Sequence, residues 1–331
     1  MGGRMHRWRL GPRSWRFVLV AVVLVAVLVT GYEAWHGVPR AMASSIGRLG
    51  VDWVKLEQGR SRVAGLQDWS PVRAAGVAVG DVLVAERWYD LERRLQPGEA
   101  LRLGVETDTG LRAITVQAVA RPHASLAYRL FVPVQAVTCF AGIAFGALIG
   151  WRLTHSGSGR ALALAFVASS TNLYPGASPP GWPQQLEQLA FSLALAPGWF
   201  ALAVFALRFP DDDPKHLRAR LKPLLPALGV LGLGAVAVTA WRGLGLGDRL
   251  FIPAMTAYSV ITGSVVIACL IDGWRRHAGA QRRRFAWMVA TFGLMVVPSW
   301  FPAIAEWLDW TFAGWRFVAM SVCSLAGLVG L

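Results

Sequence analysis

Residues 13–32 read RSWRFVLVAVVLVAVLVTGY, with two arginines followed by an almost unbroken apolar run. A helix needs about 20 apolar residues to cross the hydrocarbon core of a bilayer. Backbone polar groups inside that core must pair within the segment, so a helix is the structure that this run predicts. We expect a membrane anchor at 15–32 behind a basic cytoplasmic N-terminus at 1–14.

The same run has the composition of a secretory signal peptide, which also begins with basic residues and continues with an apolar core. The nearest Ala-x-Ala cleavage pattern, at 41–43, lies well beyond the run, and Tyr32, Trp35 and His36 suit a cleavage site poorly. An uncleaved anchor is therefore the favoured interpretation.

Seven further apolar stretches follow, and the whole chain is 55% hydrophobic with a mean hydropathy of +0.45. Such a composition is atypical of a soluble domain. We expect an all-α membrane bundle of about eight transmembrane helices, with a seven-helix region at 130–331. The predicted spans after the anchor are 130–151, 161–174, 189–207, 224–240, 251–274, 285–304 and 317–331.

Lys and Arg are distributed unequally between the short loops: alternate loops hold 17, and the others hold only Arg242, Arg249 and Arg316. Basic residues are retained on the cytoplasmic side of a membrane. The distribution predicts a multi-pass protein of the bacterial inner membrane with a cytoplasmic N-terminus. The same distribution explains the net charge of +14, so we expect no nucleic acid as a partner.

The last apolar stretch has 15 residues before the chain stops, fewer than a full span needs. We expect a longer protein, in which further sequence follows Leu331.

The region between the first two spans, 33–129, is long enough for a separate domain outside the membrane. Apolar and polar residues alternate in it at 51–56, 61–66, 82–85, 101–105 and 111–116, which predicts β-strands. Turn residues separate these segments. We expect a small, β-rich extracytoplasmic domain.

Residues 70–83 of this region read SPVRAAGVAVGDVL. This stretch resembles the PDZ family, whose bacterial members carry Ser-Pro-Ala-x-x-Ala-Gly-Leu-x-x-Gly-Asp-x-Ile, and the likeness extends over about 47–119. The residues suit the fold: Ser70 and Pro71 start a short helix, Gly76 ends it, and Gly80 makes a tight turn into a buried strand.

The resemblance implies binding of an extended peptide, whose carboxylate is held by backbone amides. Leu49, Gly50 and Val51 are the expected amide-bearing loop. Only 90–95 remains for the helix that lines the groove, which is short for the family. A rigid spacer or a dimer surface is the alternative role.

An anchor, an outward PDZ-like domain and seven closely spaced helices together resemble the input region of competence-pheromone-type bacterial sensor histidine kinases. The element Leu207-Arg208-Phe209-Pro210-Asp211-Asp212 is similar to a recurrent one there. The resemblance implies a sensor of a two-component system with a cytoplasmic output domain in cis or trans. A peptide or lipid-like ligand is expected at outer helix ends, where candidate residues are Asn172, Tyr174, Glu187, Glu306 and Asp309.

Gly142, Gly146 and Gly150 repeat every four residues in the second span and predict close helix packing, with a homodimer interface as an alternative. Asp272 is the one carboxylate inside a predicted span, and we expect it to pair with Arg275 or Arg276. One buried carboxylate supports an ion-coupled transporter only weakly.

The sequence contains no zinc-protease His-Glu-x-x-His motif and no phosphate-binding glycine loop, and its six histidines are scattered. We therefore expect no catalytic residue, metal or cofactor, and a non-enzymatic sensory module. The alternatives are a PDZ-containing scaffold or regulator of an envelope protease or secretion partner, and a small transporter.

Overall fold

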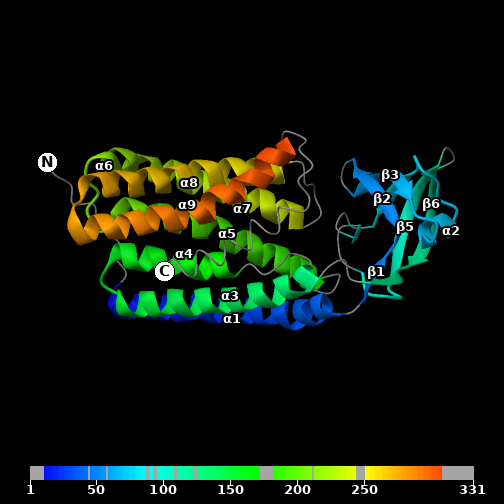
Figure 1. The fold of residues 1–331 in the computed structure, drawn as a ribbon, viewed down its shortest axis with the longest axis horizontal. Coiled ribbons are helices and arrows are strands. Elements are labelled where there is room, and N and C mark those ends of the chain that lie inside the picture. The colour runs from blue at the N-terminus through cyan, green and yellow to red at the C-terminus, as the bar shows by residue number, and fades with distance from the viewer. Residues whose placement is uncertain are drawn as a thin grey trace.

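The computed structural model describes residues 11–43, 45–56, 59–86, 90–91, 95–107, 110–122, 126–171, 182–210, 212–243 and 250–307. Figure 1 shows two parts, an elongated bundle of helices and a β domain beyond one end of it. The chain enters the β domain from α1 (Pro12–Met42) and returns to the bundle through α3 (Leu126–Arg152). These two helices lie side by side and antiparallel, so the β domain is an insertion between neighbours.

The predicted spans 130–151, 189–207, 224–240, 251–274 and 285–304 fall on helices, and so do residues 161–170 of the span predicted at 161–174, whose last three residues lie outside the described part of the chain. After α3 the bundle contains α4 (Gly157–Ser170), α5 (Trp182–Arg208), the short α6 (Leu217–Leu221) with the 3-10 turn η2 (Lys222–Leu224), α7 (Leu225–Gly243), α8 (Phe251–Arg276) and α9 (Gly279–Trp307). The stretch at 317–331 lies outside the described residues.

Within the described part of the chain, four segments are long and apolar enough to cross a membrane: Pro12–Pro39, Pro133–Arg152, Leu217–Trp241 and Pro253–Arg276. Leu193–Arg208 is a shorter apolar helix. Large apolar side chains point outward on this bundle, and Phe17 and Leu233 are 79% and 71% exposed. Exposed apolar surface of this extent is unfavourable in water and favourable against lipid tails.

The first helix is longer than the sequence indicates, since α1 continues from the predicted end at Tyr32 to Met42. Ala34 and Val38, in this additional part, pack against the buried Ala136 and Cys139 of α3. Beyond the end of the apolar run, α1 thus stays helical where it packs against α3.

The basic helix ends gather at the end of the bundle away from the β domain (Figure 1). There the Trp15 indole Nε1 of α1 donates a hydrogen bond to the Gly150 carbonyl near the end of α3, at 2.9 Å. Arg276 Nε is 2.7 Å from Asp272 Oδ1, one helical turn away. The predicted pairing of Asp272 is therefore confirmed, with Arg276 as its partner.

The β domain contains a five-stranded antiparallel sheet in the order β2-β3-β4-β5-β6. Its strands are β2 (Val51–Lys55), β3 (Arg60–Leu66), β4 (Val82–Ala85), β5 (Ala100–Thr107) and β6 (Gly110–Gln117). The five strand segments predicted from alternation are confirmed. Their inward side chains, including Val63, Leu83 and Val105, close one core with Val72 of the short helix α2 (Pro71–Ala74).

Two further strands form a separate ribbon that alternation did not predict. β1 (Ser45–Arg48) pairs antiparallel with β7 (Val119–Pro122), from Ser45 opposite Pro122 to Arg48 opposite Val119. The ribbon joins the β domain to the bundle, because α1 precedes β1 and α3 follows β7. Their sequences, Ser-Ile-Gly-Arg and Val-Ala-Arg-Pro, do not alternate regularly between apolar and polar residues, so they gave no strand signal.

The helix start and turns predicted from residues 70–83 are present. Ser70 Oγ accepts hydrogen bonds from the Val72 and Arg73 N–H groups and so caps α2. Gly76 and Gly80 have φ values of +80° and +100°. The Asp81 carboxylate accepts from the Ala78 N–H at 2.9 Å, which closes the turn into β4.

We expect Gly80→Val to destabilise the β domain by about 1 kcal/mol or more, because a β-branched residue is strained at this φ although a Cβ meets no atom within 4 Å. Urea unfolding of a fragment spanning 43–122 measures the change. Val79→Ala, at the exposed neighbouring residue, is the matched control and should have little effect. A disordered circular dichroism spectrum for the unsubstituted fragment would contradict an independent domain.

Candidate functional site

The predicted amide-bearing loop, Leu49-Gly50-Val51, lies between the ribbon and the sheet. It follows β1 directly and leads into β2, which pairs only with β3 among the described strands. β2 is therefore an edge strand, and an edge strand is the part of a sheet to which an extended peptide adds.

Both carbonyl groups at the start of this loop are engaged within the β domain. The Leu49 carbonyl accepts a hydrogen bond from Ser70 Oγ at 2.7 Å, and the Gly50 carbonyl accepts one from the Gln67 N–H at 2.9 Å. Gly50 adopts a φ of +62°, which favours glycine. Internal bonding of the carbonyls leaves the N–H groups as the parts of the loop suited to a carboxylate.

A tryptophan covers the loop. A Cβ at Gly50 would lie 3.0 Å from the Trp69 ring, and the Arg121 guanidinium carbon lies 3.9 Å from the centroid of that indole. The Leu49 side chain is only 5% exposed. The loop is closed in this structure, so a peptide carboxylate reaches it only after Trp69 has moved.

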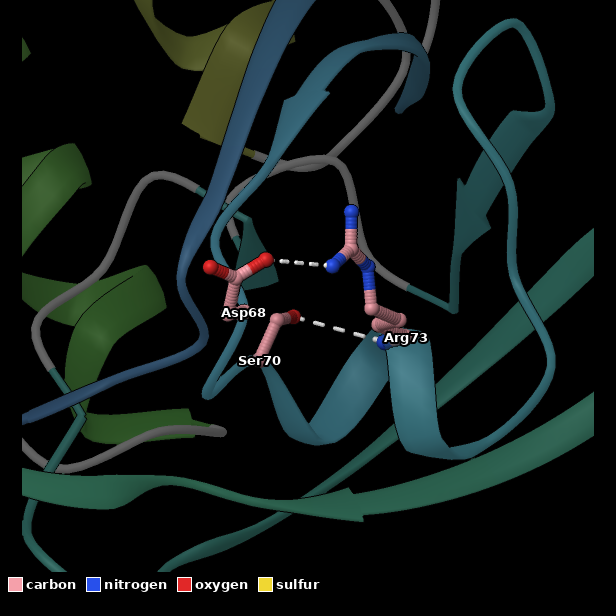
Figure 2. Close-up of polar contacts among 3 residues, drawn as sticks. All are labelled: Asp68, Ser70 and Arg73. Carbon is pink, nitrogen blue, oxygen red and sulfur yellow. Dashed lines mark hydrogen bonds and ion pairs between the residues drawn. The ribbon is translucent and has the colours of Figure 1, made fainter.

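Asp68 and Ser70, which precede and follow Trp69 in the chain, both contact Arg73 (Figure 2). Arg73 Nη1 is 2.6 Å from Asp68 Oδ1, and the Arg73 N–H donates to Ser70 Oγ at 3.4 Å. Asp68 is fully exposed, so its ion pair with Arg73 is screened by water and contributes little. The buried Ser70, which bonds both α2 and Leu49, is the stronger restraint on the turn.

The segment expected to line the groove is described at Asp90, Leu91 and Leu95. Leu91 and Leu95 are buried in the core of the β domain. The Leu95 carbonyl also accepts a hydrogen bond from the Gly47 N–H at 2.9 Å, which joins this segment to β1. The rest of the segment, 92–94, lies outside the described residues.

The ribbon is seated closely on the β domain. A Cβ at Gly47 would overlap the Gln96 carbonyl, and Arg121 of β7 stacks on Trp69. The loop is therefore connected to both strands of the ribbon. It follows β1 directly in the chain, and Trp69, which covers it, stacks with Arg121 of β7.

A pair of buried polar residues in the C-terminal half of α1 was missed from the sequence. Glu33 and Thr30 are 2% and 0% exposed, and Glu33 interacts electrostatically with Cys139 of α3. Because the apolar run ends at Tyr32, the sequence predicts that Glu33 lies in the region after the helix. Continuation of α1 to Met42 instead places this carboxylate inside a helix and within a candidate span.

The predicted ligand residues at the outer helix ends stay a prediction. Asn172, Tyr174 and Asp309 lie outside the described residues, while Glu187 belongs to α5 and Glu306 to α9. No group of three or more His, Cys, Asp or Glu side chains in the described part of the chain is arranged to hold a metal ion.

The glycine face of α3 is covered by helices of the same chain. A Cβ at Gly142 would overlap Ser170 Oγ, and one at Gly146 would lie 2.9 Å from Val167, both in α4. At Gly150 the neighbours at 2.9 Å are Ala163 of α4 and Leu19 of α1. The three glycines let α3 approach both helices at distances that a larger residue would prevent.

The element at 207–212 ties together the basic end of the bundle. The Asp212 carboxylate accepts hydrogen bonds from the Gly157 and Ser158 N–H groups, at 2.7 and 2.6 Å, and so caps α4. The Phe209 ring lies 5.1 Å from that of Phe285 in α9, and its carbonyl accepts a hydrogen bond from Arg218 of α6.

The pKa of Asp212 reflects this capping. Partial burial raises the pKa, but the hydrogen bonds from the Ser158 and Gly157 backbone outweigh it and leave the pKa below its ordinary value. A carboxylate with a lowered folded-state pKa stabilises the protein above its ordinary pKa, and this contribution is lost as the pH falls through the folded value.

Comparison with protein-family models, with curated proteins and with solved structures finds no match for this chain.

We expect Asp212→Ala to destabilise the bundle by about 1 kcal/mol, the usual cost of removing a helix cap. The contribution should be complete above about pH 4, near the ordinary carboxyl pKa, and should disappear below it. Thermal unfolding of the full chain in detergent across this pH range measures both effects. Asp213→Ala removes the neighbouring exposed carboxylate and serves as the control; an equal loss in both variants would contradict the capping role.

Proposed function

We propose that the chain is the sensory input module of a signal-transduction protein in the bacterial inner membrane. In this proposal the PDZ-like β domain lies outside the membrane and takes part in recognising a peptide or lipid-like signal. The helix bundle carries the response to a cytoplasmic output domain in cis or trans. The observation that carries the proposal is the β1–β7 ribbon, which links the ligand-type loop to two packed helices.

A sensor requires a ligand that binds two arrangements of the protein with different affinity. The loop at Leu49 and Gly50 is covered by Trp69, which supports a closed arrangement that ligand binding opens. Movement of Trp69 changes its contact with Arg121 in β7, while movement of the loop pulls directly on β1. The ribbon passes both displacements to α1 and α3.

The membrane topology belongs to the same proposal. About eight spans, with the basic helix ends inside and the β domain outside, agree with the unequal distribution of Lys and Arg. With 14 residues, α4 is about 21 Å long, shorter than a hydrocarbon core of about 30 Å. It lies between α3 and α5, where other helices rather than lipid surround much of it.

Cysteine labelling tests this orientation. In a chain lacking its native cysteines, Val79→Cys in the β domain should react with a membrane-impermeant thiol reagent in intact cells. Ala280→Cys, at the basic end, should react only after the cells are lysed. Both positions are exposed, so access from one side of the membrane decides the result. Labelling of Ala280→Cys from outside would overturn the proposed topology.

A disulfide across the ribbon tests signal transfer. Ser45 and Pro122 are directly opposite each other, so Ser45→Cys with Pro122→Cys should lock the two strands. In residues 1–331 fused to a reporter kinase, oxidation should change basal kinase output, and reduction should restore it. The measurement is phosphorylation of the reporter in membrane vesicles.

The matched control is the disulfide formed by Arg102→Cys and Thr115→Cys. These two residues are opposite each other in β5 and β6, away from the ribbon. This lock should leave output unchanged. Identical output with the ribbon locked and unlocked would count against a sensor and favour a PDZ-like scaffold, which the closed loop also suits. Solute movement by the unfused chain in vesicles, abolished by Glu33→Gln, would instead favour a transporter.

A further inference from the structure

Three arginines meet where α1 begins and α3 ends. Arg13 and Arg16 lie in the first turns of α1, and Arg152 is the last residue of α3. The hydrogen bond from Trp15 to the Gly150 carbonyl holds these two helix ends together. The Arg16 guanidinium carbon lies 4.8 Å from the centroid of the Trp151 ring, so it is positioned across the junction of the two helices.

Among the described residues, no carboxylate forms an ion pair with these three arginines. Helices α1, α3 and α4 together contain a single acidic residue, Glu33, at the opposite end of the bundle. Asp212 does reach this region from the segment after α5, but its oxygens accept the Gly157 and Ser158 N–H groups. The exposed cluster therefore has an excess of positive charge that an external anion can balance.

An exposed apolar surface runs from this cluster along both helices. On α1 the residues that follow Arg16 at helical spacing are Val20, Leu24 and Val27, and all are exposed. On α3 those that precede Trp151 at the same spacing are Leu148, Phe140 and Val137, also exposed. The two stripes begin side by side, because Arg16 lies over Trp151, and the two helices stay packed together at Ala26 and Ile143.

We propose that this surface is a binding site for an anionic phospholipid. Arg13, Arg16 and Arg152 hold the phosphate, since guanidinium groups form paired hydrogen bonds with phosphate oxygens. Trp151, which is 51% exposed, lies at the level of the headgroup, and an acyl chain runs along the apolar stripes. The occupant is a membrane lipid because phosphate and hydrocarbon sites are continuous. The site is independent of the proposed sensory role.

The test uses the full chain in nanodiscs of phosphatidylcholine alone or mixed equally with phosphatidylglycerol. The anionic lipid should raise the unfolding temperature of the unsubstituted protein, because a ligand of the native state stabilises it. In Arg13→Gln/Arg16→Gln this rise should be lost. Phosphatidylglycerol adducts in native mass spectra should fall roughly fivefold for each arginine removed.

Two variants separate the site from a general charge effect. Arg102→Gln removes an exposed arginine of the β domain and should retain the full rise. Arg16→Lys keeps the positive charge and should retain most of it. A full rise in the double glutamine variant would overturn the proposal. An equal, Arg16-dependent rise with inorganic phosphate in phosphatidylcholine discs would also overturn it, because the occupant would then be a free anion.

Discussion

The packing of α1 against α3 determines how the rest of the molecule is arranged. The contact extends along the bundle, from Leu19 beside Gly150, through Ala26 with Ile143, to Ala34 with Ala136. Small residues at these positions let the helix backbones approach closely, which in lipid replaces the hydrophobic driving force that packs helices in water. Since the helices are antiparallel, the two ends of the inserted β domain emerge together, and the β1–β7 ribbon can form.

The carboxylates of the bundle lie towards its two ends. Asp272 pairs with Arg276 and Asp212 caps α4, both at the basic end. Glu33 is buried towards the other end of α1, beside Cys139 of α3. A carboxylate in this position is costly in a membrane and is usually retained for function. Its location on the proposed signalling path makes it relevant to the sensor and transporter interpretations alike.

The turn predicted at 70–83 is present, but the loop that was expected to bind a peptide carboxylate is closed. Ser70, Gly76 and Gly80 adopt the local structure that the motif predicts. The loop before β2 is nevertheless covered by Trp69, which stacks with Arg121. Trp69 and Arg121 are both half-buried, so their stacking contributes up to about 2 kcal/mol, which is still small compared with the stability of a domain. Such a contact is suited to a switch, and equally to a spacer that never opens.

Local patterns in the sequence determined the helices, the five sheet strands and the turns at 70–83. Apolar runs, alternation and glycine positions act over a few residues, and each gives a local backbone preference. The pairing of Asp272 was also predictable, because its partner lies one helical turn away. The continuation of α1 past Tyr32, the ribbon and the cover over Gly50 were decided by tertiary structure. Each depends on contacts between segments distant in the chain, such as Ser45 with Pro122 and Trp69 with Arg121, for which a single sequence contains no periodic signal.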